Sequence, residues 1–371
     1  MTRRFLARER AALTAYFPEL ADALASCVLA NVEVARSPAI EWFRTSGAGN
    51  LLIPSKWRGR GASALDAVRV QRAIGSRAPS LAVASAMHHF SVATVVEMAE
   101  RGTGLEGLLL EGIASRRLLV ASGFSEGVSG QSILAPAMRV ARTADGLRIT
   151  GSKKPCSLAW SMDLLTASVV DGAELFVVLI PAESEGLSRK PFWSTPVLGG
   201  AESDEVVLDG VLVPDRLAFR AGSPEQMDDV QTSGFLWFEL LITASYIGIA
   251  SALVERVLEK TSVAAVDAIR AASGVEASMA ALETIALAMD GGARGGDELA
   301  RLLLIRGSIQ SSIHEASSLV AELLGGMSFI SSGDVAYLLA ASRALSFHPP
   351  SRLATARGVA RYLAGAELRI E

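Results

Sequence analysis

Two short donor-rich segments decide the fold: residues 122–131 read SGFSEGVSGQ, and residues 151–157 read GSKKPCS. Both combine serine hydroxyls with glycines, which leave backbone N–H groups open to a ligand and adopt conformations that other residues avoid. Between them the chain turns at Asp145-Gly146, a dipeptide typical of tight β-hairpins. We therefore expect a hairpin that brings the two segments together along the edge of a ligand-binding cleft.

The regions around this hairpin predict a change from helices to strands and back. Two further Asp-Gly pairs, Asp171-Gly172 and Asp209-Gly210, lie between runs rich in Val, Ile and Leu and predict further hairpins. Before and after these runs, apolar residues recur at three- and four-residue spacing, which indicates helices. We predict an α+β protein with three parts: a helical domain over residues 1–118, an antiparallel β-barrel or sandwich over 119–222, and a four-helix bundle over 223–371.

Several segments resemble the acyl-CoA dehydrogenase superfamily of flavoproteins, in the order in which that family carries them. Residues 125–131 resemble the family's loop beside the flavin ring, and residues 151–157 resemble the strand that follows it. Further similar segments are 53–61 (IPSKWRGRG), 206–214 (VVLDGVLVP) and 322–329 (ELLGGMSF). The resemblance extends from about Trp57 to Ser351 and implies the family's helix–β–helix fold.

The resemblance also implies FAD as the cofactor. Ser125 would bind near the pyrimidine end of the flavin ring and Ser157 near its N5 atom, while a turn-capping role for both serines stays open. Gly130 and Gln131 would lie beside the pyrophosphate. The other residues assigned to the cofactor are Phe124, Cys156, Glu322 and Ser351, together with Gly325 and Gly326 from a neighbouring subunit.

The family's chemistry needs a base that removes a proton beside a thioester while hydride passes to the flavin. In one branch this base is a loop glutamate, but the matching position here is Pro349, which has neither a carboxylate nor an N–H, so the chain would be an atypical member. His348 is one position away and titrates in a suitable range, although a role in the Pro-Pro helix break stays open.

A second branch of the family carries its base on the first long C-terminal helix. The matching position is Phe238, and Glu239 follows it in an almost wholly apolar run. A lone carboxylate in such a run needs a raised pKa or a cationic partner, so a buried ion pair is the alternative to catalysis. We name Glu239 and His348 as the candidate catalytic bases.

Composition indicates a soluble globular protein, with 50% hydrophobic and 20% charged residues among 371. A net charge of −4 without a basic tail argues against nucleic acid as a partner. Cys27 and Cys156 stand far apart and outside any CxxC motif, so they predict neither a disulfide nor a metal site. No signal-peptide pattern is visible, and residues 235–254 are interrupted by Glu239, so we expect a cytoplasmic protein without a membrane span.

These inferences lead to one main functional hypothesis, FAD-dependent desaturation of a short or medium acyl thioester carried on CoA or an acyl carrier protein. Such an enzyme would pass electrons to an acceptor protein and would form a homotetramer or homodimer. Because the usual base is missing, a flavin-dependent monooxygenase is an alternative, in which His88 or His89 could donate a hydrogen bond near the cofactor. A non-catalytic subunit that supports an active partner is the third hypothesis.

Overall fold

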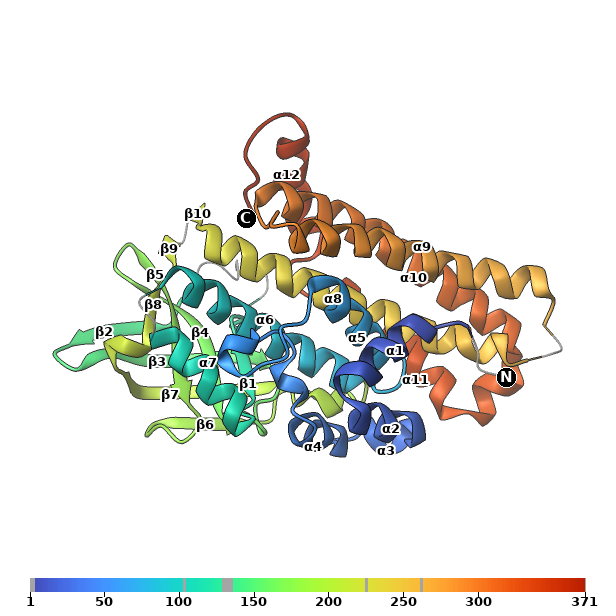
Figure 1. Ribbon diagram of the computed structural model, residues 1–371, viewed down its shortest axis with the longest axis horizontal. Coiled ribbons are helices and arrows are strands. Elements are labelled where there is room, and N and C mark those ends of the chain that lie inside the picture. Colours follow the sequence, from blue (N-terminus) through green and yellow to red (C-terminus); the bar gives the residue numbers. More distant parts are fainter. Residues whose placement is uncertain (1–3, 103–104, 129–135, 224–225, 261–262, 371) are drawn as a thin grey trace.

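The computed structural model describes residues 4–102, 105–128, 136–223, 226–260 and 263–370. Figure 1 shows a β region at one end of an elongated molecule, with helices packed against it and extending to the other end. Helices come first, strands follow, and helices return, so the predicted order of elements is confirmed.

The part before the first strand is helical, and local signals set where its helices begin. Ser63 caps α5, because its Oγ accepts the N–H of Asp66 at 3.0 Å. Pro79 stands at the start of α6, where a missing N–H is tolerated. The helices are α1 (Ala7–Tyr16), α2 (Pro18–Ser26), α3 (Leu29–Val32), α4 (Pro38–Thr45), α5 (Ala64–Gly75), α6 (Pro79–Arg101) and α7 (Leu105–Arg116).

The β region consists of two four-stranded sheets, with strand orders β1-β4-β5-β8 and β2-β3-β7-β6. β1 pairs with β4 in parallel, whereas the other pairs in these sheets are antiparallel. The predicted barrel is therefore not confirmed. The strands are β1 (Val120–Gly123), β2 (Arg139–Thr143), β3 (Gly146–Cys156), β4 (Leu164–Asp171), β5 (Glu174–Pro181), β6 (Leu187–Lys190), β7 (Asp204–Val213), β8 (Ala218–Arg220) and the short pair β9 (Gly222–Ser223) and β10 (Gln226–Met227).

Two of the three Asp-Gly pairs form the predicted hairpins. Asp145-Gly146 connects β2 to β3, and Asp171-Gly172 connects β4 to β5. The third prediction is wrong, because Asp209-Gly210 lies inside β7. There the two residues bulge outward opposite the single residue Thr150, and Gly210 takes a positive φ of 65°.

The helices after the sheets are α8 (Asp229–Leu258), α9 (Ala265–Asp290), α10 (Gly296–Ser331), α11 (Gly333–Ser342) and α12 (Arg352–Leu363). α8 begins with a capping box, in which Asp228 and Gln231 each accept the other's backbone N–H. Both α6 and α8 are long and apolar enough to cross a membrane, but 94% and 100% of their most apolar windows are buried inside the protein. They are therefore core helices, and the predicted cytoplasmic location stays a prediction.

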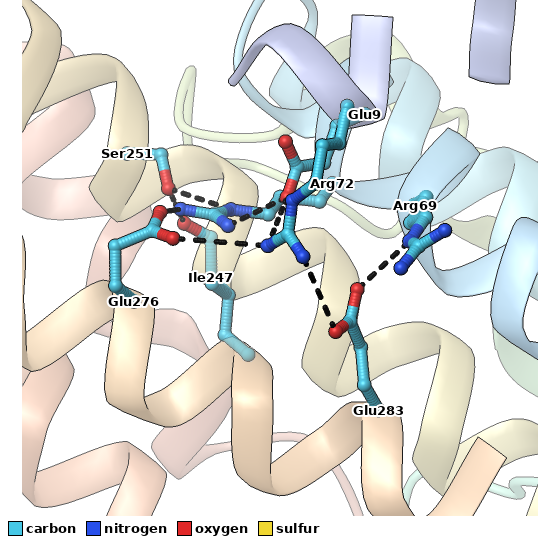
Figure 2. Close-up of polar contacts among 8 residues, drawn as sticks. Glu9, Arg69, Arg72, Ile247, Ser251, Glu276 and Glu283 are labelled. Atoms are coloured by element: carbon cyan, nitrogen blue, oxygen red, sulfur yellow. Dashed lines mark hydrogen bonds and ion pairs between the residues drawn. The ribbon is translucent and has the colours of Figure 1, made fainter. Parts of the chain in front are cut away.

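α8 runs along the middle of the helical part (Figure 1) and packs against α5. A Cβ atom added to Gly248 would lie 2.4 Å from the carbonyl oxygen of Arg72, so this crossing requires glycine. Figure 2 shows Glu9, Glu276 and Ser251 grouped around Arg72, which joins α1, α5, α8 and α9. Because α6 and α8 also pack directly together, the division into domains at 118 and 222 stays a prediction.

Candidate active site

A cavity lies where the β region meets α6 and α8. Both donor-rich segments reach it: Ser122, Phe124 and Ser125 from the first, and Pro155 and Ser157 from the second. The structure thus brings together the two segments that the hairpin was expected to join.

The β side of this cavity carries a row of hydroxyl groups. Ser122 belongs to β1, Ser125 follows it, and Ser157 follows β3, with its Oγ 3.0 Å from Oγ of Ser203. Ser168 Oγ on β4 is buried and finds no hydrogen-bond partner among the residues that the structure describes. Buried hydroxyls are normally paired. This row is therefore suited to bind the nitrogen and oxygen atoms along the edge of a planar ligand.

The helical side of the cavity is aromatic. Phe90 on α6 lies 5.6 Å from Phe124 and 5.2 Å from Phe238 between ring centroids, and Phe235 stacks on Phe238 at 5.9 Å. Such rings can pack against the face of a flat ligand or hold an apolar one. The cavity therefore combines a polar wall with an apolar wall.

His348 enters the cavity from the segment between α11 and α12, next to Pro349, which also lines it. The imidazole packs edge-on against Tyr246, with ring centroids 5.3 Å apart, and no described residue hydrogen-bonds its ring nitrogens. Burial and the nearby Arg306 lower the pKa of His348 well below its ordinary value. At neutral pH the imidazole is uncharged, so it can accept a hydrogen bond, or, as a weak base, a proton from a group more acidic than an ordinary ammonium.

The structure does not bring Glu239 into the cavity. Phe238 lines it instead, and a step of one residue on a helix rotates the side chain by about 100°. Oε2 of Glu239 lies 3.2 Å from Nη1 of Arg306, so the buried ion pair considered as the alternative is present. Burial raises the pKa of Glu239 to about 7, and Arg306 opposes that shift.

Of three other residues of the predicted cofactor site, only Cys156 is described, and it does not line the cavity. Gly130 and Gln131 lie outside the described residues, so their predicted role stays a prediction. Cys156 is buried in the core, where its Sγ lies 3.3 Å from the carbonyl oxygen of Lys153. Burial raises the pKa of this thiol to about 12, which makes it unreactive.

The predicted C-terminal contributors do not line the cavity of their own chain. Glu322 and Gly326 are exposed on α10, and Gly325 interrupts that helix with a φ of 75°. Ser351 caps α12, where its Oγ accepts the N–H of Ala354 at 3.2 Å. The predicted roles of Glu322 and Ser351 in cofactor binding, and the predicted contact of Gly325 and Gly326 with the cofactor of a neighbouring subunit, stay predictions.

His88 and His89 are both buried and neither lines the cavity. His88 has a structural role, because its Nε2 lies 2.9 Å from the carbonyl oxygen of Gly49 and its Nδ1 accepts the N–H of Val120. The expectation that one of them works beside the cofactor is therefore not met in this chain.

A buried ion pair holds the middle of the first donor-rich segment. Lys153 is fully buried and lies 2.8 Å from Oε1 of Glu126, whose carboxylate also accepts the N–H of Ala137. This pair ties the loop after β1 to β3, and it anchors Ser125 beside the cavity.

Several cavity residues were missed by the sequence interpretation. Ser168, Ser203 and Trp193 lie on distant strands or loops, and no local motif marks them. Phe235 and Phe238 had a signal, since a spacing of three places both on one face of a helix. In a helix that is apolar all round, that signal does not say which face is functional.

Comparison with known proteins shows the family to which the chain belongs. No family model matches it. Over 365 residues it is 42% identical to the isobutylamine N-hydroxylase of Streptomyces viridifaciens, covering 95% of this chain and 96% of that enzyme. The chain belongs to that enzyme's family.

Two solved structures show the same fold. Dibenzothiophene monooxygenase (TdsC) from Paenibacillus sp. A11-2 matches with a TM-score of 0.79 and 18% identity over 98% of each chain, and it is also solved with FMN. PigA, solved with FAD and proline, matches with a TM-score of 0.79 and 16% identity over 98% of each chain. The predicted α+β fold is confirmed, and both proteins hold the kind of cofactor that the motifs predicted.

The predicted desaturation of an acyl thioester is wrong. The relative at 42% identity is an N-hydroxylase, and TdsC is a monooxygenase, so the family is one of flavin-dependent oxidoreductases that do not act on CH–CH bonds. The acyl-CoA or acyl-carrier-protein substrate and the protein electron acceptor depended on that reaction. Pro349 and the turned-away Glu239 therefore do not mark an atypical dehydrogenase.

Proposed function

We propose that this protein is a flavin-dependent monooxygenase that converts a small primary alkylamine into its hydroxylamine. The observation that carries the proposal is the pair His348 and Pro349 in the cavity wall. Thioester chemistry requires a carboxylate base in the cavity, and none of the described lining residues is Asp or Glu, whereas oxidation of an amine nitrogen requires only an acceptor for one proton. The N-hydroxylase relative supports the same reaction class.

The residues present fit a flavin, and we propose FAD. The hydroxyls of Ser122, Ser125, Ser157 and Ser168 would bind the polar edge of its ring, and the unpaired Ser168 Oγ has room for one such contact. The aromatic wall would lie against the ring or the substrate. Bound in its reduced form, the flavin would supply two electrons and activate dioxygen for transfer of one oxygen atom.

The cavity favours an uncharged amine. Among the described residues that line it, none is Asp, Glu, Lys or Arg, so an ammonium group would lose its hydration without gaining a counter-ion. The neutral amine keeps the lone pair that attacks oxygen, and a ring nitrogen of His348 would take up the proton that the nitrogen then loses. The reaction balances as amine, O2, two electrons and two protons giving hydroxylamine and water.

The test is direct oxygenation by the purified chain. The protein is incubated with FAD, an NAD(P)H-dependent flavin reductase and isobutylamine under 18O2, and mass spectrometry should detect the hydroxylamine with one labelled oxygen. A parallel reaction with FMN identifies the preferred flavin. Turnover by the chain alone would exclude the non-catalytic subunit.

His348→Gln is the matched variant for this assay. We expect it to keep the fold and to lower kcat about a hundredfold, because proton transfer loses its acceptor. Failure of the wild-type protein to form hydroxylamine while reduced flavin and oxygen are consumed would refute the proposal.

A further inference from the structure

Arg306, on α10, lies buried behind the segment that carries His348 into the cavity. Its Nη2 donates to the carbonyl oxygens of Leu345 at 3.1 Å and His348 at 3.0 Å, and its Nη1 donates to that of Pro350 at 2.8 Å. Nη1 also faces Glu239 across 3.2 Å. One side chain therefore binds three backbone carbonyls on both sides of the histidine.

This segment cannot anchor itself. Pro349 and Pro350 have no N–H group, and the N–H groups of Ser346 and Phe347 are used within the preceding short helical turn. Its carbonyl groups therefore need donors from outside the segment. A planar guanidinium offers several N–H groups in fixed directions, which a lysine ammonium does not.

We propose that Arg306 is a positioning residue that fixes His348 in the cavity before any ligand enters, with Glu239 as its buried counter-ion. The inference rests on the proposed function, in which the imidazole receives a proton from the substrate nitrogen. Arg306 itself does not line the cavity, so its effect passes through the backbone of residues 345–350. Glu239 thereby has a role that needs no contact with substrate.

The histidines of this chain provide a readout that does not depend on turnover. There are four, and His88 and His89 are buried on α6, away from the segment. With histidine labelled with 13C at the ring, His348 is assigned by its loss in His348→Gln. We expect one sharp His348 signal in the wild-type protein without flavin or amine, because the imidazole is held in one position.

Arg306→Lys keeps the positive charge and removes the planar guanidinium whose N–H groups bind the three carbonyls. We expect its His348 signal to broaden or split while the His88 and His89 signals stay in place, and kcat to fall about a hundredfold, since a small misplacement of a reacting group has effects of this size. In Arg306→Ala, added guanidinium should restore part of the activity and of the His348 signal.

Glu239→Gln is the matched control. Its amide oxygen still accepts a hydrogen bond from Arg306, so we expect a wild-type His348 signal and near wild-type kcat, with a lower melting temperature because the guanidinium loses its counter-ion.

A wild-type His348 signal and kcat in Arg306→Lys would overturn the proposal, as would several His348 signals in the free wild-type protein. Loss of activity in Glu239→Gln with an unchanged His348 signal would also overturn it. Absence of hydroxylamine from wild type would refute the proposed function alone, because the spectra still decide the role of Arg306.

Discussion

Two adjacent residues of one type have opposite surroundings on α6. His88 satisfies both ring nitrogens with backbone groups of Gly49 and Val120, whereas neither ring nitrogen of His89 has a partner in the described part of the chain. Both rings are fully buried. Replacement of His88 would leave a buried N–H group and a buried carbonyl without hydrogen-bond partners, whereas replacement of His89 would leave no such group.

We therefore expect His88→Leu to lower the free energy of unfolding by about 1–3 kcal/mol, the penalty of unpaired buried polar groups. His89→Leu, of similar size, should leave stability unchanged or raise it. Urea unfolding at pH 7.5 measures both variants. Equal loss of stability in the two would contradict this assignment.

The same two histidines predict sensitivity to acid. Burial lowers the pKa of His88 to about 4 and places the pKa of His89 well below its ordinary value. The unfolded chain then binds more protons than the folded chain below about pH 6.5, so stability present above that pH falls as the pH drops toward 4. His89→Leu should lose less stability than wild type between pH 7 and pH 5, measured by urea unfolding at each pH. A fall as steep as in wild type would contradict this.

At the scale of elements, the network around Arg72 holds four helices together (Figure 2). Arg72 is fully buried and lies 2.8 Å from Glu9, which is itself only 2% exposed. Arg72→Met should lower the free energy of unfolding by about 3–5 kcal/mol, because it leaves the buried Glu9 carboxylate with only the longer 3.9 Å contact to Arg8. The matched control is Arg69→Met, whose partner Glu283 lies nearer the surface, and it should lose at most about 1 kcal/mol. Similar losses in both variants, by thermal or urea unfolding, would contradict the difference.

Elements also show where sequence reasoning succeeds. Ser63, Pro79 and Asp145-Gly146 act through their immediate neighbours, so the starts of α5 and α6 and the β2–β3 hairpin were predictable. Asp209-Gly210 has the same composition as a turn, but glycine with positive φ serves a bulge equally well. Pairing with a distant strand decided between them, and a local pattern contains no information about that pairing.

The residues of the site were likewise predictable only where a local motif marks them. Ser125 and Ser157 stand in motifs, whereas Ser168 and Ser203 reach the cavity only through sheet packing. Glu239 was misplaced because α8 is apolar on every side, so periodicity does not orient it. Pairing with Arg306, far along the chain, sets the direction of this carboxylate.

At the scale of the whole molecule, large apolar side chains remain exposed near the end of α10 and around the start of α12. The exposed fractions are 73% for Met327, 78% for Ile330, 80% for Phe347 and 83% for Leu353. Met327 and Ile330 form one patch at the end of α10, and Phe347 and Leu353 lie apart from it, because α12 packs against the first part of α10. Exposed apolar patches mark association sites. The predicted homodimer or homotetramer stays a prediction, and the patch at the end of α10 is where we expect its contacts.

Light scattering tests the assembly. The wild-type chain should run as a dimer or tetramer, and Met327→Lys with Ile330→Lys should shift it toward monomer, because two charges would then be buried without partners. Leu108→Lys, at an exposed apolar position on α7, is the control and should not change the mass. A wild-type monomer at micromolar concentration would contradict the expectation.

Trp193 forms part of the cavity wall and is fixed by a hydrogen bond from its Nε1 to the carbonyl oxygen of Val197 at 2.8 Å. The fluorescence of Trp193 can consequently report whether the cavity is occupied. Indole emission excited in the ultraviolet should be quenched when a flavin enters beside it, and Trp193→Phe should remove most of that change. Cofactor affinity can therefore be measured without any label, even for variants too inactive to assay.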